Sequence, residues 1–236
     1  MTEQTTNFRQ LYIDYLNEPS GYMTEDRHGR PAKQQKSRVR YPQQYSNVKE
    51  TPLGDSVDLN TIDKKKSKIF VWSDQHFGHK NIIKYSNRPF ADIDEMRETM
   101  IRNHNDMVGM DDYVIWVGDV AFLNDDKANE ILHRLNGYKI LIIGNHDMQK
   151  KKLKRLHVDE VHLLYDIEVD GVTMVFTHFP ITNLPKPIVN VHGHTHDKED
   201  QSVQHINVSV ERIGYKPVPF DNLIVEAQGR ALKMLT

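Results

Sequence analysis

Apolar and polar positions alternate along the chain in short runs that predict a mixed α/β protein. Runs rich in β-branched and aromatic residues end abruptly in polar loops, as strands do. The predicted strands are residues 68–72, 113–117, 138–143, 161–169, 172–177, 188–191, 205–210 and 223–227, with a last turn near Gln228-Gly229. Asp170-Gly171 joins two of these runs and is typical of a tight hairpin turn.

Helical spacing of apolar residues occurs between the first strands. It predicts helices over residues 93–108 and about 126–135, and a brief helix over residues 148–156. Asn136-Gly137 is a typical helix end. Apolar residues at helical spacing also predict a short helix near the N-terminus, ended by Glu18-Pro19-Ser20-Gly21.

The composition changes near residue 66, which predicts an N-terminal extension (residues 1–66) and a main domain (residues 67–236). The second part of the extension is polar, contains prolines and shows little apolar periodicity. It carries six basic side chains and no acidic one between Arg27 and Arg40: Arg27, Arg30, Lys33, Lys36, Arg38 and Arg40. A solvated linker explains such a run, and contact with nucleic acid or another polyanion is the alternative.

Composition narrows the possible chemistry. The chain has 236 residues, no Cys and 13 His, so disulfides and thiolate metal sites are excluded. A net charge of −2 argues against a surface built throughout for nucleic acid. The N-terminus does not resemble a signal peptide, and the apolar runs are too short to span a membrane. We therefore expect a cytoplasmic protein, or one of the host cytoplasm if the chain is viral.

Metal-binding types of side chain follow five of the predicted strands. They are Asp74 and His76, Asp119, Asn145 with His146, His178, and His194 with His196. Loops at the ends of strands in an α/β sheet converge, so these side chains are expected to meet. Imidazole and carboxylate groups suit Mn²⁺, Fe²⁺ or Zn²⁺. The number of ligands exceeds the need of one tetrahedral ion and favours a pair bridged by a carboxylate.

These residues resemble the motifs of the calcineurin-like metallophosphoesterases. Asp74-x-His76, Gly118-Asp119, Gly144-Asn145-His146-Asp147, His178 and Gly193-His194-x-His196 occur in the same order, and the likeness covers about residues 67–225. The chain is also similar to a bacterial and phage subgroup of small phosphoesterases. The shared marks are Ser73-Asp74-x-His76-Phe77-Gly78-His79-x-Asn81-Ile82-Ile83, Asn87-Arg88-Pro89-Phe90, and Asn207-Val208 to Gly214-Tyr215-x-Pro217. The resemblance implies a four-layer α/β (α+β) fold, in which two mixed β-sheets pack as a sandwich flanked by helices.

The resemblance also implies a role for each residue. Asp74, His76 and His196 would bind one ion, Asn145, His178 and His194 the other, and Asp119 both. His146, oriented by Asp147, would stabilise the reacting phosphate or protonate the leaving group. The ions would be Mn²⁺, with Fe, Zn, Ni, Co or Mg as alternatives, and would turn a bridging water into hydroxide.

The protein Ser/Thr phosphatases of this superfamily differ in two motifs. Here Gly118-Asp119 continues as Val-Ala-Phe-Leu-Asn, and Asp147 occupies the position of a Glu. Both differences argue against a protein phosphatase. His79 and Arg88 are expected to contact the substrate, because an Arg fork suits phosphate. The alternatives are a hydrogen bond at a helix start for His79 and a structural ion pair for Arg88.

The leading hypothesis for function is hydrolysis of a small phosphate monoester, a nucleotide or deoxynucleotide. The second is a phosphodiesterase or nuclease that acts on cyclic nucleotides or single-stranded nucleic acid and uses the basic run of Arg27–Arg40. The third is a metal-binding scaffold without catalytic activity. The sequence leaves the oligomeric state open.

Overall fold

The structure, a computed structural model, describes residues 7–17, 51, 56–147, 156–200 and 202–236. The chain divides into two compact units, residues 1–48 and 49–236, which are described separately. In the first unit, helix α1 (Phe8–Asn17) forms where the apolar spacing predicted a helix. The basic run between Arg27 and Arg40, and all but the last residue of the helix predicted over residues 148–156, lie outside the described residues.

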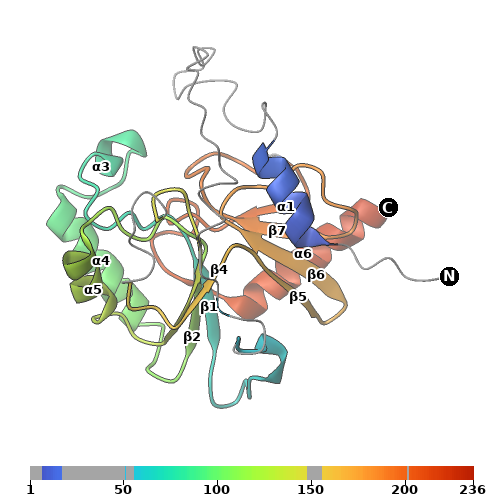
Figure 1. Ribbon diagram of the computed structural model, residues 1–236, viewed down its shortest axis with the longest axis horizontal. Coiled ribbons are helices and arrows are strands. Elements are labelled where there is room, and N and C mark those ends of the chain that lie inside the picture. Colours follow the sequence, from blue (N-terminus) through green and yellow to red (C-terminus); the bar gives the residue numbers. More distant parts are fainter. Residues whose placement is uncertain (1–6, 18–50, 52–55, 148–155, 201) are drawn as a thin grey trace, which may run out of the picture. The chain divides into compact units, whose positions relative to one another are not determined.

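Two mixed sheets form the body of the second unit (Figure 1). The five-stranded sheet has the order β4-β3-β2-β1-β9 and consists of β1 (Ile69–Trp72), β2 (Tyr113–Trp116), β3 (Tyr138–Ile142), β4 (Glu160–His162) and β9 (Val218–Pro219). The four-stranded sheet has the order β5-β6-β7-β8 and consists of β5 (Tyr165–Val169), β6 (Val172–Thr177), β7 (Val189–His192) and β8 (His205–Asn207). In each sheet one edge strand is antiparallel to its neighbour, β9 in the first and β5 in the second, and the other pairs are parallel. The predicted fold of two mixed sheets flanked by helices is confirmed.

Alternation along the central strands explains why the first sheet is covered on both faces. Phe70 and Trp72 of β1 belong to a core shared with helices α4 (Ile93–Asn105) and α5 (Asp125–Leu132). Ile69 and Val71 belong instead to the core shared with the second sheet. Successive side chains of a strand point to opposite faces, so one apolar run packs against a helix layer and a sheet layer at once.

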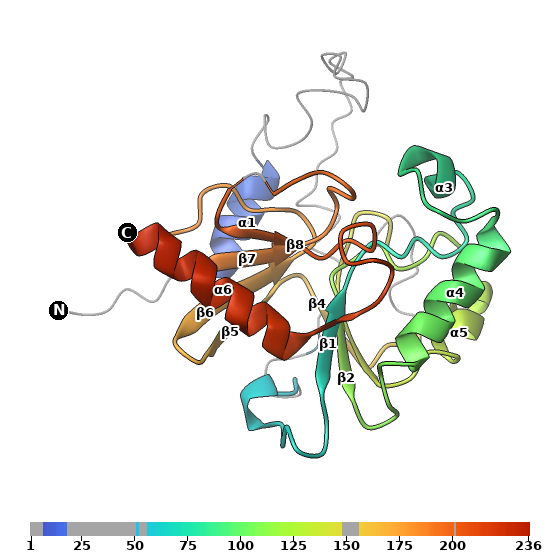
Figure 2. The ribbon, with the colours of Figure 1, turned by 180° about the vertical axis from the view of Figure 1, so that it is seen from behind.

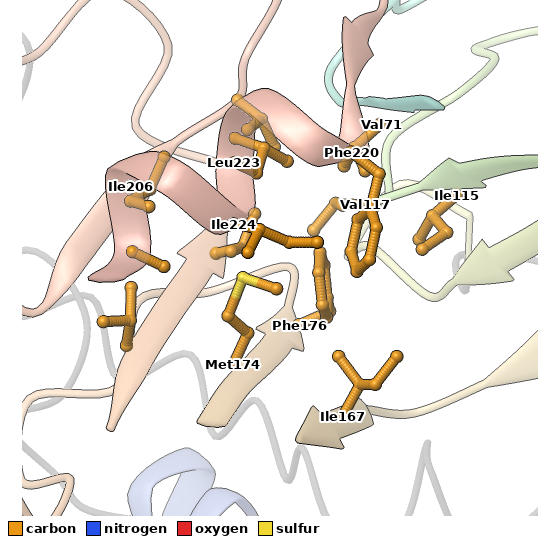
Figure 3. Close-up of a cluster of buried hydrophobic side chains, with 14 of the residues drawn as sticks. Val71, Ile115, Val117, Ile167, Met174, Phe176, Ile206, Phe220, Leu223 and Ile224 are labelled. Carbon is orange, nitrogen blue, oxygen red and sulfur yellow. The ribbon is translucent and has the colours of Figure 1, made fainter. Parts of the chain in front are cut away.

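Helix α6 (Phe220–Leu235) corrects the strand predicted over residues 223–227. Its buried residues Phe220, Leu223, Ile224, Ala227 and Ala231 repeat at helical spacing. The helix contacts β6, β7, β1 and β9 and joins the core between the sheets (Figures 2 and 3). A short apolar run does not distinguish a buried strand from a buried helix, and the Gly229 predicted to form a turn lies within α6.

The single strand predicted over residues 161–169 is also wrong, because the chain passes from one sheet to the other within this range. Residues 160–162 (β4) pair with β3 in the first sheet, and residues 165–169 (β5) pair with β6 in the second. The apolar pattern continues through Leu163, which is buried, so it does not reveal the crossing. Beyond β8, Ser209 forms only a single bridge to Ser73, so the strand predicted over residues 205–210 is shorter than expected.

Three short elements were not predicted: helix α3 (Ile82–Tyr85), β9 and a 3-10 helix, η2 (Leu59–Thr61). Leu59 is part of the core between the sheets, so the described residues just before Ser67 pack against the main body. None of the helices that the structure describes is long and apolar enough to cross a membrane.

Candidate metal centre

The loops that follow β1, β2 and β3 of the first sheet and β6 and β7 of the second carry side chains that meet at one site. His76 Nε2 lies 3.7 Å from Asp74 Oδ1 and 3.5 Å from Asp119 Oδ2. From the other sheet, His178 Nε2 lies 3.4 Å from the same Asp119 oxygen. The convergence predicted from the strand ends is therefore present, with Asp119 at its middle.

The ligand-type atoms fall into overlapping groups. One group is Asp74, His76 and His196, and another is Asp119, His178 and His194; within each group the atoms lie within 4.8 Å of one another. Asn145 joins the second group, because its Oδ1 lies 3.1 Å from His178 Nε2. These two groups contain the same residues as the two ion sites implied by the resemblance. A third group joins His146 to His76 and Asp119, so His146 is also within reach of an ion.

Buried polar atoms at this site fit a bound cation. Asp74 Oδ1 and both ring nitrogens of His76 are buried and make no hydrogen bond within the part of the chain that the structure describes. A buried carboxylate that lacks a partner is costly, so such an arrangement favours a bound cation. Burial opposes ionisation of Asp119, but the charge of His178 and its hydrogen bond hold the pKa of Asp119 well below its usual value. Asp119 is therefore held in the carboxylate form, which is the form that binds metal.

The histidines of the second group have opposite pKa shifts. Burial lowers the pKa of His178, but the Asp119 carboxylate outweighs this effect and raises the pKa to about 10. Burial, together with the charge of His178, lowers the pKa of His194 to about 3. His194 is therefore a neutral imidazole at neutral pH, which is the form that binds metal. The raised pKa of His178 shows that the place beside the Asp119 carboxylate favours a positive charge.

The backbone at the site is held in an uncommon conformation. Five of the predicted ligands have positive φ angles: Asp74 (60°), His76 (51°), Asp119 (55°), His194 (65°) and His196 (53°). Among the described residues other than glycine, only Asn87, Asp170 and Tyr215 share this feature. The left-handed region costs a residue with a side chain about 1 kcal/mol or more, and such strain is concentrated at functional sites. The ligand loops are thus a second, independent indication of a binding site.

Two glycines explain how the loops approach the carboxylates so closely. A Cβ on Gly193 would lie 2.3 Å from Asp74 Oδ2, and one on Gly144 would lie 2.3 Å from Asp119 Oδ1. Either distance is far too short for any side chain. The glycines of the Gly-Asn-His and Gly-His motifs are therefore required because the ligand carboxylates occupy the space beside them.

Hydrogen bonds from the surrounding residues orient the ligands. Asp74 Oδ2 accepts bonds from the backbone N–H of His194 (2.9 Å) and the hydroxyl of Ser209 (3.0 Å), which leaves Oδ1 toward the site. His178 Nδ1 donates to the backbone carbonyl of Val117 at 2.8 Å, so Nε2 faces Asp119. Partners of this kind fix the tautomer of a ligand histidine.

Asp147 has a different position from the one expected. Its Oδ2 accepts from the backbone N–H groups of Asp119 (2.7 Å) and Gly144 (2.9 Å), and its Oδ1 accepts from Val120 (3.1 Å). The ring Nδ1 of His146 has no hydrogen-bond partner among the described residues. Asp147 therefore holds the loops after β2 and β3 together and does not orient His146. Burial, and then the charge of Asp119, raise the pKa of Asp147 to about 6.

Arg88 is also used differently from the expectation. Its side chain is buried, and its guanidinium donates to the carbonyls of Asp74 (2.7 Å) and Gln75 (2.8 Å) and to Met96 Sδ. The remaining N–H groups pair with Glu211 Oε1, at 2.9 Å from Nε and 2.7 Å from Nη2. An arginine has five N–H donors, and all five are engaged here. Arg88 therefore fixes the loop after β1 and takes part in a structural ion pair with Glu211. Its expected contact with substrate stays a prediction.

His79 and His146 lie at the rim of the site. The backbone N–H of His146 donates to Asp119 Oδ1 at 2.8 Å, and its half-buried ring points Nε2 to within 3.8 Å of Asp119 Oδ2. Burial lowers the pKa of His146, and burial with the charge of His76 lowers the pKa of His79 to about 4. The His79 ring stacks on Phe122 with centroids 4.7 Å apart. Its expected contact with substrate stays a prediction.

Three residues whose role was not predicted from the sequence support the candidate ligands: Ser209, Glu211 and Asn207. Glu211 Oε1 binds His196 Nδ1 at 3.0 Å in addition to Arg88, and Asn207 Nδ2 donates to the backbone carbonyl of His196 at 2.9 Å. All three lie in the stretch of residues 207–217 that carries part of the subgroup resemblance. That resemblance was the available signal for these residues. Their distance along the chain from the residues that they support follows no fixed spacing, so spacing could not reveal them.

No family model matches the sequence. The uncharacterized protein MJ1445 of Methanocaldococcus jannaschii is 36% identical over 168 residues, which are 66% of this chain and 89% of that protein. This chain therefore belongs to the same family as MJ1445. A crystal structure of the protein of unknown function AQ665 from Aquifex aeolicus aligns with a TM-score of 0.54 and 26% identity, over 66% of this chain and 97% of that one. Yfce, a phosphoesterase from E. coli, aligns at a TM-score of 0.35 and 17% identity, over 60% of this chain and 78% of its own, which is too slight a likeness to carry an argument.

Proposed function

We propose that this chain, a member of the family of MJ1445, is a phosphoesterase that depends on two metal ions. The observation that carries the proposal is the meeting of ligand-type side chains from both sheets around Asp119, in three overlapping groups of which two contain its carboxylate. One ion uses three or four protein ligands, whereas seven side chains converge here. A pair of ions about 3.5–4 Å apart is a usual arrangement in enzymes that hydrolyse phosphate esters.

The site suits Mn²⁺, and Fe, Zn, Ni, Co or Mg are alternatives that the same nitrogen and oxygen ligands accept. When bound, the pair would supply positive charge to the phosphate and lower the pKa of a water molecule. In the overall reaction the bond from phosphorus to the leaving oxygen breaks, a bond from phosphorus to the oxygen of water forms, and the leaving oxygen takes a proton.

His146 is the side chain best suited to donate a proton to the leaving group of the ester. Its ring lies beside the site, with Nε2 3.8 Å from the shared carboxylate, and its Nδ1 makes no hydrogen bond with the described residues. An imidazole N–H at this distance would donate to a phosphate oxygen or to the leaving oxygen. The backbone of His146, bonded to Asp119 Oδ1, keeps the ring in place.

We further propose that the substrate is a small monoester, a nucleotide or deoxynucleotide monophosphate. The test uses the full chain, stripped by chelation and reloaded with Mn²⁺. One panel contains nucleoside and deoxynucleoside monophosphates; the other contains cyclic nucleotides, bis(p-nitrophenyl) phosphate and single-stranded DNA. Release of phosphate from the first panel alone supports the proposal. Cleavage of the second panel makes the enzyme a diesterase, and no metal-dependent cleavage of either refutes a phosphoesterase.

Variants connect any activity to the site. His146→Ala is expected to lower kcat by a factor of about 10²–10⁴, the usual contribution of a proton-transfer group, with Mn²⁺ affinity nearly unchanged. A large loss of Mn²⁺ affinity would make His146 a ligand, and unchanged turnover would refute its catalytic role. His133→Ala is the matched control, since His133 pairs with His157 on the exposed surface, away from the site.

A further inference from the structure

Exposed aromatic rings gather at the rim of the candidate site. Among the described residues, the large apolar side chains that remain well exposed include two aromatic ones, Tyr85 (51%) and Phe122 (46%). Both contact His79: the Tyr85 ring meets it edge-on with centroids 6.0 Å apart, and the Phe122 ring stacks on it at 4.7 Å. Tyr85 ends α3 and Phe122 follows β2, so two separate loops bring these rings together.

The rings adjoin the reactive side chains. The centroid of Phe122 lies 5.4 Å from that of His146, and the centroid of His79 lies 5.5 Å from that of His76. Phe122 is only three residues beyond Asp119, the shared carboxylate. A phosphate bound by metal ions beside Asp119 would therefore have His146 and Phe122 within reach of its organic group.

The loop that carries Phe122 is fixed by its backbone. Phe77 and Ala121 form a bridge, the N–H of Phe77 donates to the carbonyl of Val120 at 2.9 Å, and the N–H of Phe122 donates to the carbonyl of Phe77 at 2.8 Å. This backbone pairing runs directly onward from the ligands Asp74, His76 and Asp119. The backbone that carries Phe122 is therefore held beside the loops that carry Asp74, His76 and Asp119.

A single exposed apolar residue is ordinary on a protein surface. Here two exposed rings from different loops share a contact with one histidine, and both stand beside the same polar site. Aromatic faces bind planar rings of ligands by stacking, with little regard to the identity of the ring. We propose that Phe122, His79 and Tyr85 form a stacking surface for a planar aromatic ring in the leaving group of the phosphate ester, such as a nucleobase or a phenyl group. This inference rests on the proposed phosphoesterase function.

The test compares two monoesters that differ in the presence of a ring: deoxyadenosine 5′-monophosphate and glycerol 1-phosphate. Initial rates are measured with the full chain loaded with Mn²⁺, for the native protein and for Phe122→Ala, Phe122→Leu and Phe122→Tyr. Met110→Ala is the control, because Met110 is an apolar residue that is 75% exposed and makes none of these ring contacts. Competitive inhibition by inorganic phosphate reports whether the phosphate site itself is intact.

Phe122→Ala and Phe122→Leu are expected to lower kcat/KM for the nucleotide by about tenfold or more, mainly through KM, which is the usual effect of losing one stacked ring. Values for glycerol 1-phosphate and inhibition by phosphate should change less than twofold, and Phe122→Tyr should retain the native preference. An equal loss for both esters, or no loss for either, would overturn the stacking surface while the esterase function stands. If the native protein hydrolyses neither ester, the proposed function fails, and this inference fails with it.

Discussion

Addition of one methyl group at Gly193 should disable the site although no candidate ligand is replaced. In Gly193→Ala the new Cβ would lie 2.1 Å from Ser73 Oγ and 2.3 Å from Asp74 Oδ2. The φ angle of Gly193 is not in the left-handed region, so the substitution tests the lack of space and not backbone strain.

The displacement that follows can be estimated. Ordinary contact begins at 3.4 Å, so the carboxylate of Asp74 must withdraw by roughly 1 Å. That oxygen accepts bonds from the His194 N–H and the Ser209 hydroxyl, and both bonds would lengthen or break. Overpacking of a closely packed interior costs about 1–3 kcal/mol of stability. We expect Mn²⁺ affinity to fall by at least about tenfold, since orienting contacts of ligands contribute on that scale.

Isothermal titration of the chelated protein with Mn²⁺ and urea unfolding measure the two effects. Gly229→Ala is the matched control: its Cβ meets nothing within 4 Å, and Gly229 lies inside α6. It should raise the free energy of unfolding by about 0.5–1 kcal/mol, because Ala favours a helix over Gly, and leave Mn²⁺ binding unchanged. Native Mn²⁺ affinity in Gly193→Ala would refute the reasoning, because it would mean that the Asp74 carboxylate is not held where the metal binds.

Two further predictions concern residues outside the ligand groups. Glu211→Gln keeps a side chain of the same shape but removes the charge that binds His196 and Arg88, so we expect about a tenfold or greater loss of Mn²⁺ affinity in a chelator competition assay; an unchanged affinity would show that Glu211 does not orient His196. His104 is neutral in the folded protein, because burial lowers its pKa to about 4 despite a hydrogen bond to the Asn136 carbonyl, and its pKa in the unfolded chain is about 6.5. The unfolded state therefore binds a proton first as the pH falls, and His104 should destabilise the fold by about 2 kcal/mol between pH 7.5 and pH 5. His104→Gln should remove that part of the pH dependence in urea unfolding, and an identical pH profile for both proteins would exclude the assignment.

The central strands could be predicted from the sequence because burial on both faces leaves continuous apolar runs that end at polar loops. The same rule failed for residues 223–227, where a run of three apolar residues belongs to α6. It failed again at Leu163, where the chain passes from one sheet to the other without a change in apolar pattern. Local pattern reports burial, whereas the choice between helix and strand and between sheets depends on distant partners.

The meeting of the candidate ligands could be anticipated because each of them follows a strand, and the structure brings their side chains together. The contacts that hold the set could not be predicted. Asp147 and Arg88 looked suited to catalysis and phosphate binding. In the structure, Asp147 accepts from backbone N–H groups of two loops, and Arg88 donates to the carbonyls of the loop after β1. An isolated sequence shows which groups a residue offers; it does not show which neighbour uses them.

The five candidate ligands with positive φ angles make the backbone of the site unfavourable for the stability of the fold by itself. Five such residues at about 1 kcal/mol each amount to roughly 5 kcal/mol, which is comparable with the whole stability of many domains. A lineage that no longer needed the site could recover much of this free energy by replacing Asp119 or His194 with glycine, which adopts the same φ freely. Binding of an ion would offset this cost, because a ligand that binds only the folded state stabilises that state.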